Sequence, residues 1–265
     1  MTHIPAVLTG IARRARHRVP TVLTGLTRQA RDRVNFGFSK VLHRKVVVER
    51  FNTLLDDEAR LHYAPAIKTL WRVVPAVMRR KIPRANVQQG FMLAAIEQLA
   101  GGDKNKTMLC VGSFEDTACY SLQGLGYRID AIDPSINMDL AGFVRLHPER
   151  LASYDIVFST SVIEHVPDDE TFVADMVAML APGGYAILTC DYNDTWTPDQ
   201  AKPSSDVRIY TLADMQRLIA AMGDVELPDE PDWQDHDPDF TISEHGIDMH
   251  YGFATLTVQR RARFL

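Results

Sequence analysis

The chain has 265 residues, of which 46% are hydrophobic and 24% are charged, and it contains 15 Gly and 14 Pro. These proportions are those of a globular protein, so collagen-like, coiled-coil and wholly disordered chains are excluded. The net charge of −5 is divided unevenly: residues 1–50 carry eleven Lys or Arg against two acidic residues, a balance of +9, and the other 215 residues carry a balance of −14. We therefore expect a basic arm, residues 1–50, in front of an acidic body, residues 51–265.

The arm contains a short internal repeat. The segment VLTGIARRARHRV at 7–19 recurs as VLTGLTRQARDRV at 22–34, and in each copy the apolar residues fall on one helical face. Gly10, Pro20 and Gly25 divide the arm into two short amphipathic helices. Two interpretations are open: the helices lie on an anionic membrane surface, or they pack on the body or on a partner chain. A transit peptide is less favoured because Ser is scarce.

Cysteine usage and hydropathy bear on the compartment. Cys110, Cys119 and Cys190 are odd in number and lack metal-ligand spacing, which indicates a reducing cytoplasm. No apolar run reaches the roughly 18 residues of a transmembrane helix, and Arg13 and Arg14 interrupt the N-terminus where a secretory signal would be apolar. We expect a cytoplasmic protein whose arm can contact the inner face of the membrane.

Along the body the hydrophobic pattern changes from helical to an alternation of strands and helices. Residues 51–105 form a helical lead-in, with helices predicted at 51–63, 65–80 and 85–100. From residue 106 short apolar strands alternate with helices, which predicts βαβ units in a parallel sheet with helices on both faces. The predicted strands are 108–112, 127–133, 154–160, 185–192 and 253–260, and the predicted helices are 116–126, 167–180 and 211–223.

The first two strands end in residues that suit a nucleotide-containing cofactor. The first strand runs through Gly112, which lets the backbone approach a ligand, into a helix whose N-terminus offers free N–H groups. The second strand ends at Asp133, where a carboxylate can accept hydrogen bonds from both ribose hydroxyls. This pair is common to sheets that bind NAD and sheets that bind S-adenosylmethionine.

The later segments SVIEHVPDD at 161–169 and LAPGGYAILTCDY at 180–192 distinguish these two classes. With them the chain resembles the class I S-adenosylmethionine-dependent methyltransferases of the type 11/12 kind, over roughly residues 90–223. The resemblance implies a doubly wound, mostly parallel, seven-stranded Rossmann-like sheet with a terminal antiparallel hairpin, and S-adenosylmethionine as the cofactor. It also implies a cofactor site made of Gly112, Ser113, Phe114, Asp133, Asp139, Leu140 and Ser161.

Two local features depart from that family. Ser113, Phe114 and Glu115 follow Gly112 where further glycines are usual. Only 22 residues separate Asp133 from Asp155, too few for a helix, a strand and a loop, so this stretch must be compact. Asp139 within it can contact the adenine, as the resemblance implies, or can cap a helix through Phe143 and Val144.

Candidate catalytic groups are those that follow strands or lie in late loops, since methyl transfer to a hydroxyl requires a base. His165 and His250 are the leading candidates, with Asp191 and Tyr192 behind them, and Glu164 and His245 are further possibilities. We predict no metal site, because Ser161 stands where metal-dependent relatives have the first Glu of a Glu-x-x-Glu-His pattern. The loop 192–211 is long enough to cover an acceptor pocket and would line it with Tyr192, Trp196, Arg208 and Tyr210.

The acceptor is predicted from charge. Residues 224–239 hold eight acidic side chains and no Lys or Arg, which would repel phosphates, so a nucleic acid acceptor is not expected. We expect O-methylation of a sugar, a glycan or another polar small molecule. One alternative is an NAD-dependent oxidoreductase, disfavoured because no Tyr-x-x-x-Lys pair follows the third strand; another is a non-catalytic scaffold that retains the fold. The sequence does not indicate an oligomeric state.

Overall fold

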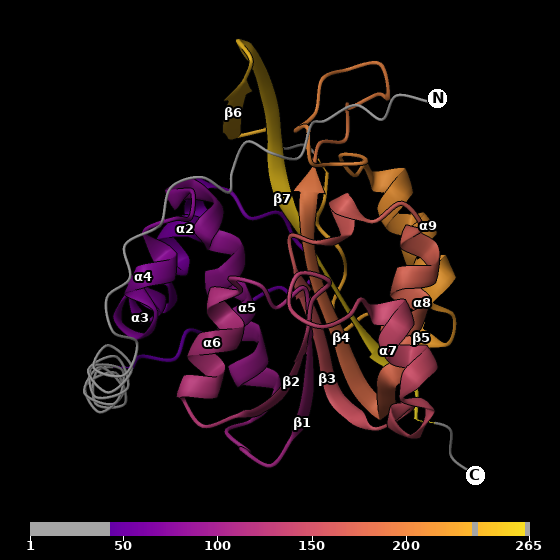
Figure 1. Cartoon of the computed structure of the whole chain (residues 1–265). Coiled ribbons are helices and arrows are strands. Elements are labelled where there is room, and N and C mark those ends of the chain that lie inside the picture. Colours follow the sequence, from indigo (N-terminus) through magenta and orange to yellow (C-terminus); the bar gives the residue numbers. More distant parts are fainter. Residues whose placement is uncertain (1–42, 235–237, 263–265) are drawn as a thin grey trace, which may run out of the picture.

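A computed structural model of the chain describes residues 43–234 and 238–262, and the predicted arm helices lie outside this range. The described chain forms three layers, with a central sheet between two groups of helices (Figure 1). Six strands follow one another in the order β2-β1-β3-β4-β7-β5, and β6 pairs only with β7. The strands are β1 Thr107–Val111, β2 Arg128–Ile132, β3 Tyr154–Thr160, β4 Leu180–Tyr192, β5 Val225–Glu226, β6 Phe240–Glu244 and β7 Ile247–Arg260.

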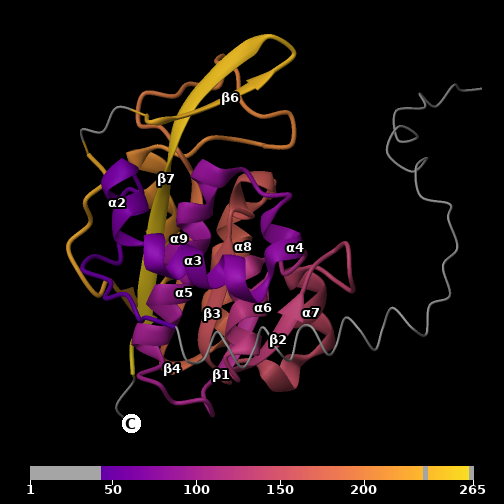
Figure 2. The same cartoon turned by 90° about the vertical axis from the view of Figure 1, so that its left-hand side faces the viewer.

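The sheet is mixed, which corrects the mostly parallel sheet that was predicted. The pairs β2-β1, β1-β3 and β3-β4 are parallel, whereas β7 runs antiparallel to β4, β5 and β6. The predicted terminal hairpin is formed by β6 and β7, which turn at His245 and Gly246 with φ values of 53° and 80°. This hairpin projects beyond the six-stranded row (Figure 2), so β6 is not a seventh member of that row.

Helices cover both faces of the sheet, as predicted for a doubly wound fold. On one face lie α2 Asp57–His62, α3 Ala64–Val73, α4 Pro75–Met78, α5 Asn86–Leu99 and α6 Thr117–Gly124, with the short η1 Pro83–Ala85 (Figure 1). On the other lie α7 Leu140–Leu146, α8 Asp169–Met179 and α9 Leu212–Met222. Short turns of 3₁₀-helix, η2 Pro148–Arg150 and η3 Ile163–His165, join the remaining segments.

Two predicted helices differ from the structure. Residues 51–55 are extended because their backbone pairs with β7: the Leu55 N–H donates to the Phe253 carbonyl at 2.8 Å, and the Thr255 N–H to the Thr53 carbonyl at 2.9 Å. The helix predicted at 65–80 divides at Pro75, which has no N–H with which to continue the hydrogen-bond ladder. The stretch 134–153 forms α7 and η2 without a strand, so its predicted compactness is confirmed.

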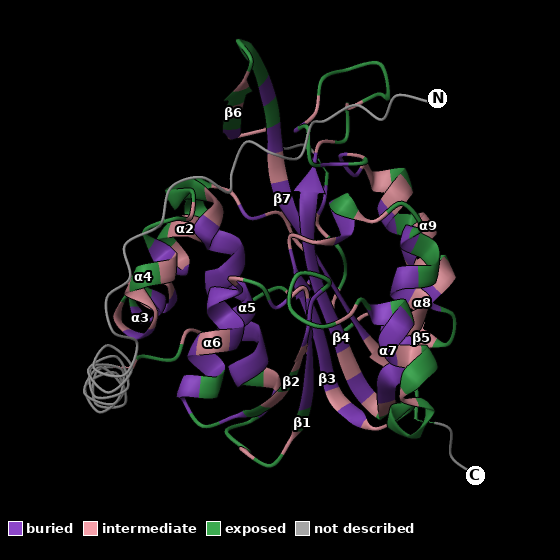
Figure 3. Cartoon of the chain, in the orientation of Figure 1, coloured by how far each residue is buried: buried purple, intermediate pink, exposed green. Residues whose placement is uncertain are grey.

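Helix α5 is the best-buried helix of the described chain. Every residue from Asn86 to Glu97 is buried, Gln88 and Gln89 included, and the helix is purple over this range (Figure 3). A helix buried on all sides packs between other elements, and here it lies between the sheet and α3, with α6 beside it (Figure 1). This placement brings polar side chains of the lead-in next to the ends of the strands.

The packed body begins before residue 51. The His43 Nε2 atom lies 2.7 Å from the Glu97 carboxylate, and the Val48 N–H donates to the Gln98 side chain at 2.8 Å. The arm, predicted to end at residue 50, therefore lies against α5 over its last residues. None of the helices in the described ranges combines the length and the apolar character that crossing a bilayer requires.

Candidate functional site

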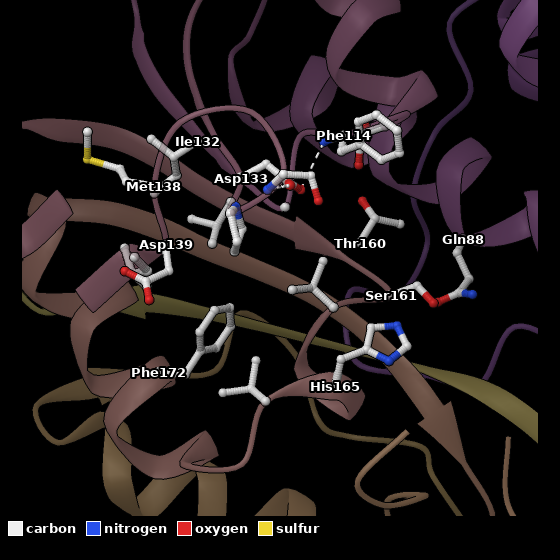
Figure 4. Close-up of a pocket in the computed structure, with 18 of the residues that line it drawn as sticks. Gln88, Phe114, Ile132, Asp133, Met138, Asp139, Thr160, Ser161, His165 and Phe172 are labelled. Carbon is white, nitrogen blue, oxygen red and sulfur yellow. Dashed lines mark hydrogen bonds between the residues drawn. The ribbon is translucent and has the colours of Figure 1, made fainter. Parts of the chain in front are cut away.

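A cavity of about 1070 Å³ opens at the carboxyl ends of β1, β2 and β3, between α5 on one side and α7 and α8 on the other. This is where parallel sheets bind their ligands, and the volume is enough for a nucleotide-sized molecule together with a second one. Its two ends differ in character (Figure 4): Met138, Asp139 and Phe172 lie at one end, and Gln88, Ser161 and His165 lie at the other.

Gly112, directly after β1, brings the backbone close to the cavity. Its φ of +81° lies in the left-handed region, and a Cβ atom placed there would stand 2.3 Å from a Val162 methyl carbon. The next residue, Ser113, is buried and does not line the cavity, because its N–H donates to the Ile132 carbonyl and its side chain faces inward. Phe114 is 55% exposed at the cavity wall.

Asp133 stands on the wall directly after β2. Its carboxylate accepts the Phe114 N–H at 3.1 Å and the Ser135 N–H at 2.7 Å (Figure 4). A carboxylate has about four acceptor positions, so two remain for a ligand. This arrangement suits the paired hydroxyls of a ribose, the role that the resemblance implies.

At the far end of the cavity, Asp139 caps a helix, as predicted, and its contact with an adenine stays a prediction. Its side chain accepts the Gly142 N–H at 2.8 Å and so caps α7, and the residue also lines the cavity. Leu140, the first residue of α7, lines the cavity with Met138 and Phe172. Three apolar side chains beside one carboxylate form a surface on which an aromatic base can stack.

At the opposite end, the chain leaves β3 through Ser161 and enters η3. Ser161 has a φ of 54°, and its hydroxyl donates to Glu164 at 2.5 Å. Burial raises the pKa of the Glu164 carboxyl to about 7. The His165 ring lines the cavity, and its hydrogen bond to Asp206 raises its pKa to about 9, so the ring is protonated at neutral pH.

Helix α5 contributes amides that the sequence did not single out. Gln88 Oε1 accepts the Thr189 hydroxyl at 2.6 Å, and among the described residues nothing accepts from its nitrogen, which leaves two N–H donors for a ligand. The Gln89 oxygen is fully used, since it accepts from Thr117 and Ala118, and its nitrogen donates to Asp116. A Gln pair inside an otherwise apolar helix is the signal that could have identified these residues.

Asp116 is a further group missed in the sequence. Its side chain caps α6 by accepting the Cys119 N–H at 2.6 Å, and it lines the cavity. Complete burial raises the pKa of this carboxyl.

Several predicted acceptor-side residues do not line the cavity, which corrects their expected placement. Tyr192 faces α9 and donates its hydroxyl to the Trp233 carbonyl at 2.8 Å. His250 lies on the projecting hairpin, where its ring pairs with Thr241 at 2.9 Å. His245 occupies the turn of that hairpin. Asp191 is buried, and the neighbouring Glu164 and Asp206 carboxyls add to the effect of burial in raising its pKa.

The loop 192–211, which follows β4, was predicted to line an acceptor pocket, but its side chains pack against other elements. Arg208 pairs with Asp169 at 2.8 Å, and the Tyr210 hydroxyl donates to the Ile163 carbonyl at 3.1 Å. Trp196 is half-buried and packs against the core cluster that includes Phe240 and Tyr251 of the hairpin. These side chains fasten the loop to α8 and the hairpin and do not form a pocket lining.

No group of three or more His, Cys, Asp or Glu side chains in the described part of the chain is arranged to hold a metal ion.

A comparison with known proteins identifies the family to which the chain belongs. Residues 84–225, more than half of the chain, match the model of a family described as a methyltransferase domain. An arsenic(III) S-adenosylmethionine methyltransferase from Chlamydomonas reinhardtii is a similar solved structure, with 16% identity, a TM-score of 0.42, and coverage of 59% of this chain and 63% of that one.

Two further solved structures are similar. The 1,6-didemethyltoxoflavin-N1-methyltransferase of Burkholderia thailandensis has 16% identity and a TM-score of 0.45, with coverage of 82% of this chain and 98% of that one. A phosphoethanolamine N-methyltransferase of Haemonchus contortus has 20% identity and a TM-score of 0.39, over 51% of this chain and 37% of that one. With similarities this weak, their acceptors give no guide to the acceptor of this chain.

Proposed function

Since the chain belongs to the methyltransferase-domain family and is an S-adenosylmethionine-dependent methyltransferase, we propose that it methylates a hydroxyl of a sugar, glycan or other polar small molecule. The observation that carries this proposal is the polar end of the cavity, where the His165 ring lies beside Gln88 and Ser161 (Figure 4). An imidazole can accept the proton of a hydroxyl, and amide N–H groups can orient a neighbouring oxygen.

The residues on the cavity wall fit the cofactor. Gly112 presents only backbone to the cavity, since Val162 fills the place of a Cβ, and Asp133 has two acceptor positions free. Met138, Leu140 and Phe172 offer an apolar surface to the adenine, with Asp139 at its edge. When bound, S-adenosylmethionine supplies an electrophilic methyl group on a sulfonium. The chain has to orient the acceptor, exclude water and take up the hydroxyl proton.

His165 is the candidate for that proton. It is the histidine among the predicted candidates that lines the cavity. Because its pKa is about 9, the neutral ring that can act as a base becomes more populated as the pH rises. We expect kcat/KM to rise with pH and to level off near 9, since this ratio reports the ionisation of the free enzyme.

The experiment is a transfer assay with labelled S-adenosylmethionine against nucleotide sugars and polysaccharide fragments. His165→Gln should lower kcat by about 10²- to 10⁴-fold and leave binding of S-adenosylhomocysteine unchanged in calorimetry. His250→Gln is the matched control and should retain activity, because its ring lies on the hairpin outside the cavity. Tight binding of NADH without binding of S-adenosylhomocysteine would overturn the proposal in favour of an oxidoreductase.

We propose a separate role for the basic arm, residues 1–50, at a membrane surface. Its charge of +9 would hold the enzyme at an anionic membrane surface, on the cytoplasmic side, where lipid-linked glycans are a suitable acceptor. The acidic stretch 224–239 and the polar cavity end favour a small-molecule acceptor over nucleic acid.

A further inference from the structure

A line of buried polar groups lies behind the His165 ring. The Nδ1 atom of His165 is 3.1 Å from the Asp206 carboxylate and 3.2 Å from the Ser205 carbonyl. The His165 side chain is 43% exposed, whereas that of Asp206 is only 2% exposed. The ring therefore reaches the cavity while the carboxylate that binds it lies in the interior.

A second buried carboxyl group, that of Asp191, lies near Asp206. The Asp191 carboxyl is buried close to Asp206 and to Tyr251 of β7, near enough for both neighbours to shift its pKa. Asp206 Oδ2 is buried and has no donor partner among the described residues. A buried, unpaired carboxylate oxygen is unfavourable, and two adjacent buried carboxylates cannot both be ionised. If Asp191 is protonated, only one of the two carboxyl groups is charged, and the Asp191 O–H can donate to the unpaired oxygen of Asp206.

Asp206 is held in place by its own segment. The Asp206 N–H donates to the Pro203 carbonyl at 3.0 Å, and the Lys202 ammonium donates to the Asp206 carbonyl. The next residue, Val207, donates its N–H to the Glu164 carbonyl at 2.7 Å, directly before His165. The segment is therefore tied to η3 on both sides of the Asp206–His165 contact.

We infer that Asp206 is a positioning residue for His165, and that Asp191 stands behind it as a neutral acid that donates to Asp206. The inference rests on the proposed role of His165 as the base. With Nδ1–H bound to Asp206, the neutral ring keeps its lone pair on Nε2, the nitrogen left to face the cavity. The acceptor proton then has one defined destination, Nε2, and the resulting imidazolium is stabilised by the adjacent carboxylate.

The charges around the ring agree with this arrangement. Asp206 raises the pKa of His165, while burial raises the pKa of Asp191 well above its usual range. The other titratable groups that face this cluster are Glu164 from η3, Lys202 from the loop and Tyr251 from β7. Glu164 is bound to Ser161 and has no hydrogen bond to the His165 ring.

The test is an NMR titration of the histidine rings of the full chain, with His165 assigned by comparison with His165→Gln. Asp206→Asn should lower the pKa of His165 by about 1 to 2 pH units, the effect of losing one close opposite charge. Above the pKa, the wild-type ring should be the Nδ1–H tautomer, because the Asp206 carboxylate and the Ser205 carbonyl both accept at Nδ1. Binding of S-adenosylhomocysteine should be unchanged in the variant, which verifies its fold.

Two further variants complete the design. Asp191→Asn keeps an N–H donor and should change the pKa of His165 by less than about 0.5 pH units, whereas a loss as large as that of Asp206→Asn would mean that Asp191 is the charged partner. Glu149→Gln is the control for an exposed carboxylate, 65% exposed and 3.1 Å from a different histidine, His147, and should leave His165 unchanged.

An unaltered His165 titration in Asp206→Asn, or the Nε2–H tautomer in the wild type, would overturn the inference. If Asp206→Asn does not fold, the wild-type titration still decides the matter, because a His165 pKa at or below about 6.5, the ordinary value, would mean that no carboxylate pairs with the ring. The titrations do not depend on methyl transfer, so a failure of the proposed function would appear as retained activity in His165→Gln, with the Asp206 results unaffected.

Discussion

Replacing Gly112 by Ala tests the close approach of the backbone to the cavity. The substitution has two separable effects. Its φ of +81° is unfavourable for a residue with a Cβ, at about 1–2 kcal/mol. The new Cβ would also stand 2.3 Å from Val162 Cγ2 and 3.3 Å from Val162 Cγ1, and a β-branched side chain has little rotamer freedom with which to move away. Overpacking of this kind amounts to about 1–3 kcal/mol.

We therefore expect Gly112→Ala to lower the free energy of unfolding by about 2–5 kcal/mol, measured by urea denaturation with tryptophan fluorescence. Gly126→Ala is the matched control, because its φ is +94° and no atom lies within 4 Å of the added Cβ. That control should lose about 1–2 kcal/mol, from the backbone alone. Adding Val162→Ala removes both methyl carbons and should restore the steric part in a double-mutant cycle.

Equal destabilisation of Gly112→Ala and Gly126→Ala, or no coupling between Gly112 and Val162, would refute the steric argument. Calorimetry on the folded variants adds an independent measurement. Binding of S-adenosylhomocysteine should weaken in Gly112→Ala, because the clash displaces Gly112 or Val162, which both line the cavity, and should be retained in Gly126→Ala.

Four other measurements test the remaining contacts. Asp133→Asn should weaken binding of S-adenosylhomocysteine by about 10- to 100-fold, the worth of a hydrogen bond to a charged acceptor; unchanged affinity in calorimetry would remove Asp133 from the site. The pKa of Glu164 is raised to about 7, so between about pH 4.5 and 7 the folded chain keeps a proton that the unfolded chain has released. The free energy of unfolding therefore falls as the pH rises through this range. Urea denaturation at pH 4.5 and at pH 7 should find a smaller difference in Glu164→Gln than in the wild type. Asp169 is buried between two arginines, so Asp169→Asn should lower the free energy of unfolding by about 3–5 kcal/mol, against less than about 1 kcal/mol for the exposed control Glu170→Gln. Deletion of residues 1–35 should weaken sedimentation with anionic liposomes without loss of transfer to a dissolved acceptor; equal liposome binding would argue against membrane contact.

Local patterns in the sequence determined most of the strands and helices. The five strands predicted between 108 and 260 are present, and the turn residues Pro182 to Gly184 lie where the register between β3 and β4 shifts. Gly112 and Asp133 could be predicted because each directly follows its strand, and parallel strands end at one edge of the sheet. The short strands β5 and β6 could not, since their pairing depends on β7, far along the chain or across a turn.

Some residues of the site could likewise be predicted from the sequence, and others only from the tertiary structure. A resemblance read from short segments identified the cofactor and placed His165 after β3, since both depend on residues close together in the chain. Gln88 and Asp206 lie 77 and 41 residues from His165, and only the packing of α5 and the anchored loop brings them beside it. Tyr192 and His250 have the right chemistry, but their side chains are directed away from the cavity by the strands that carry them. The −14 body and the +9 arm are fixed by composition; which carboxylates are charged depends on burial, because desolvation and neighbouring charges exist only in the folded chain.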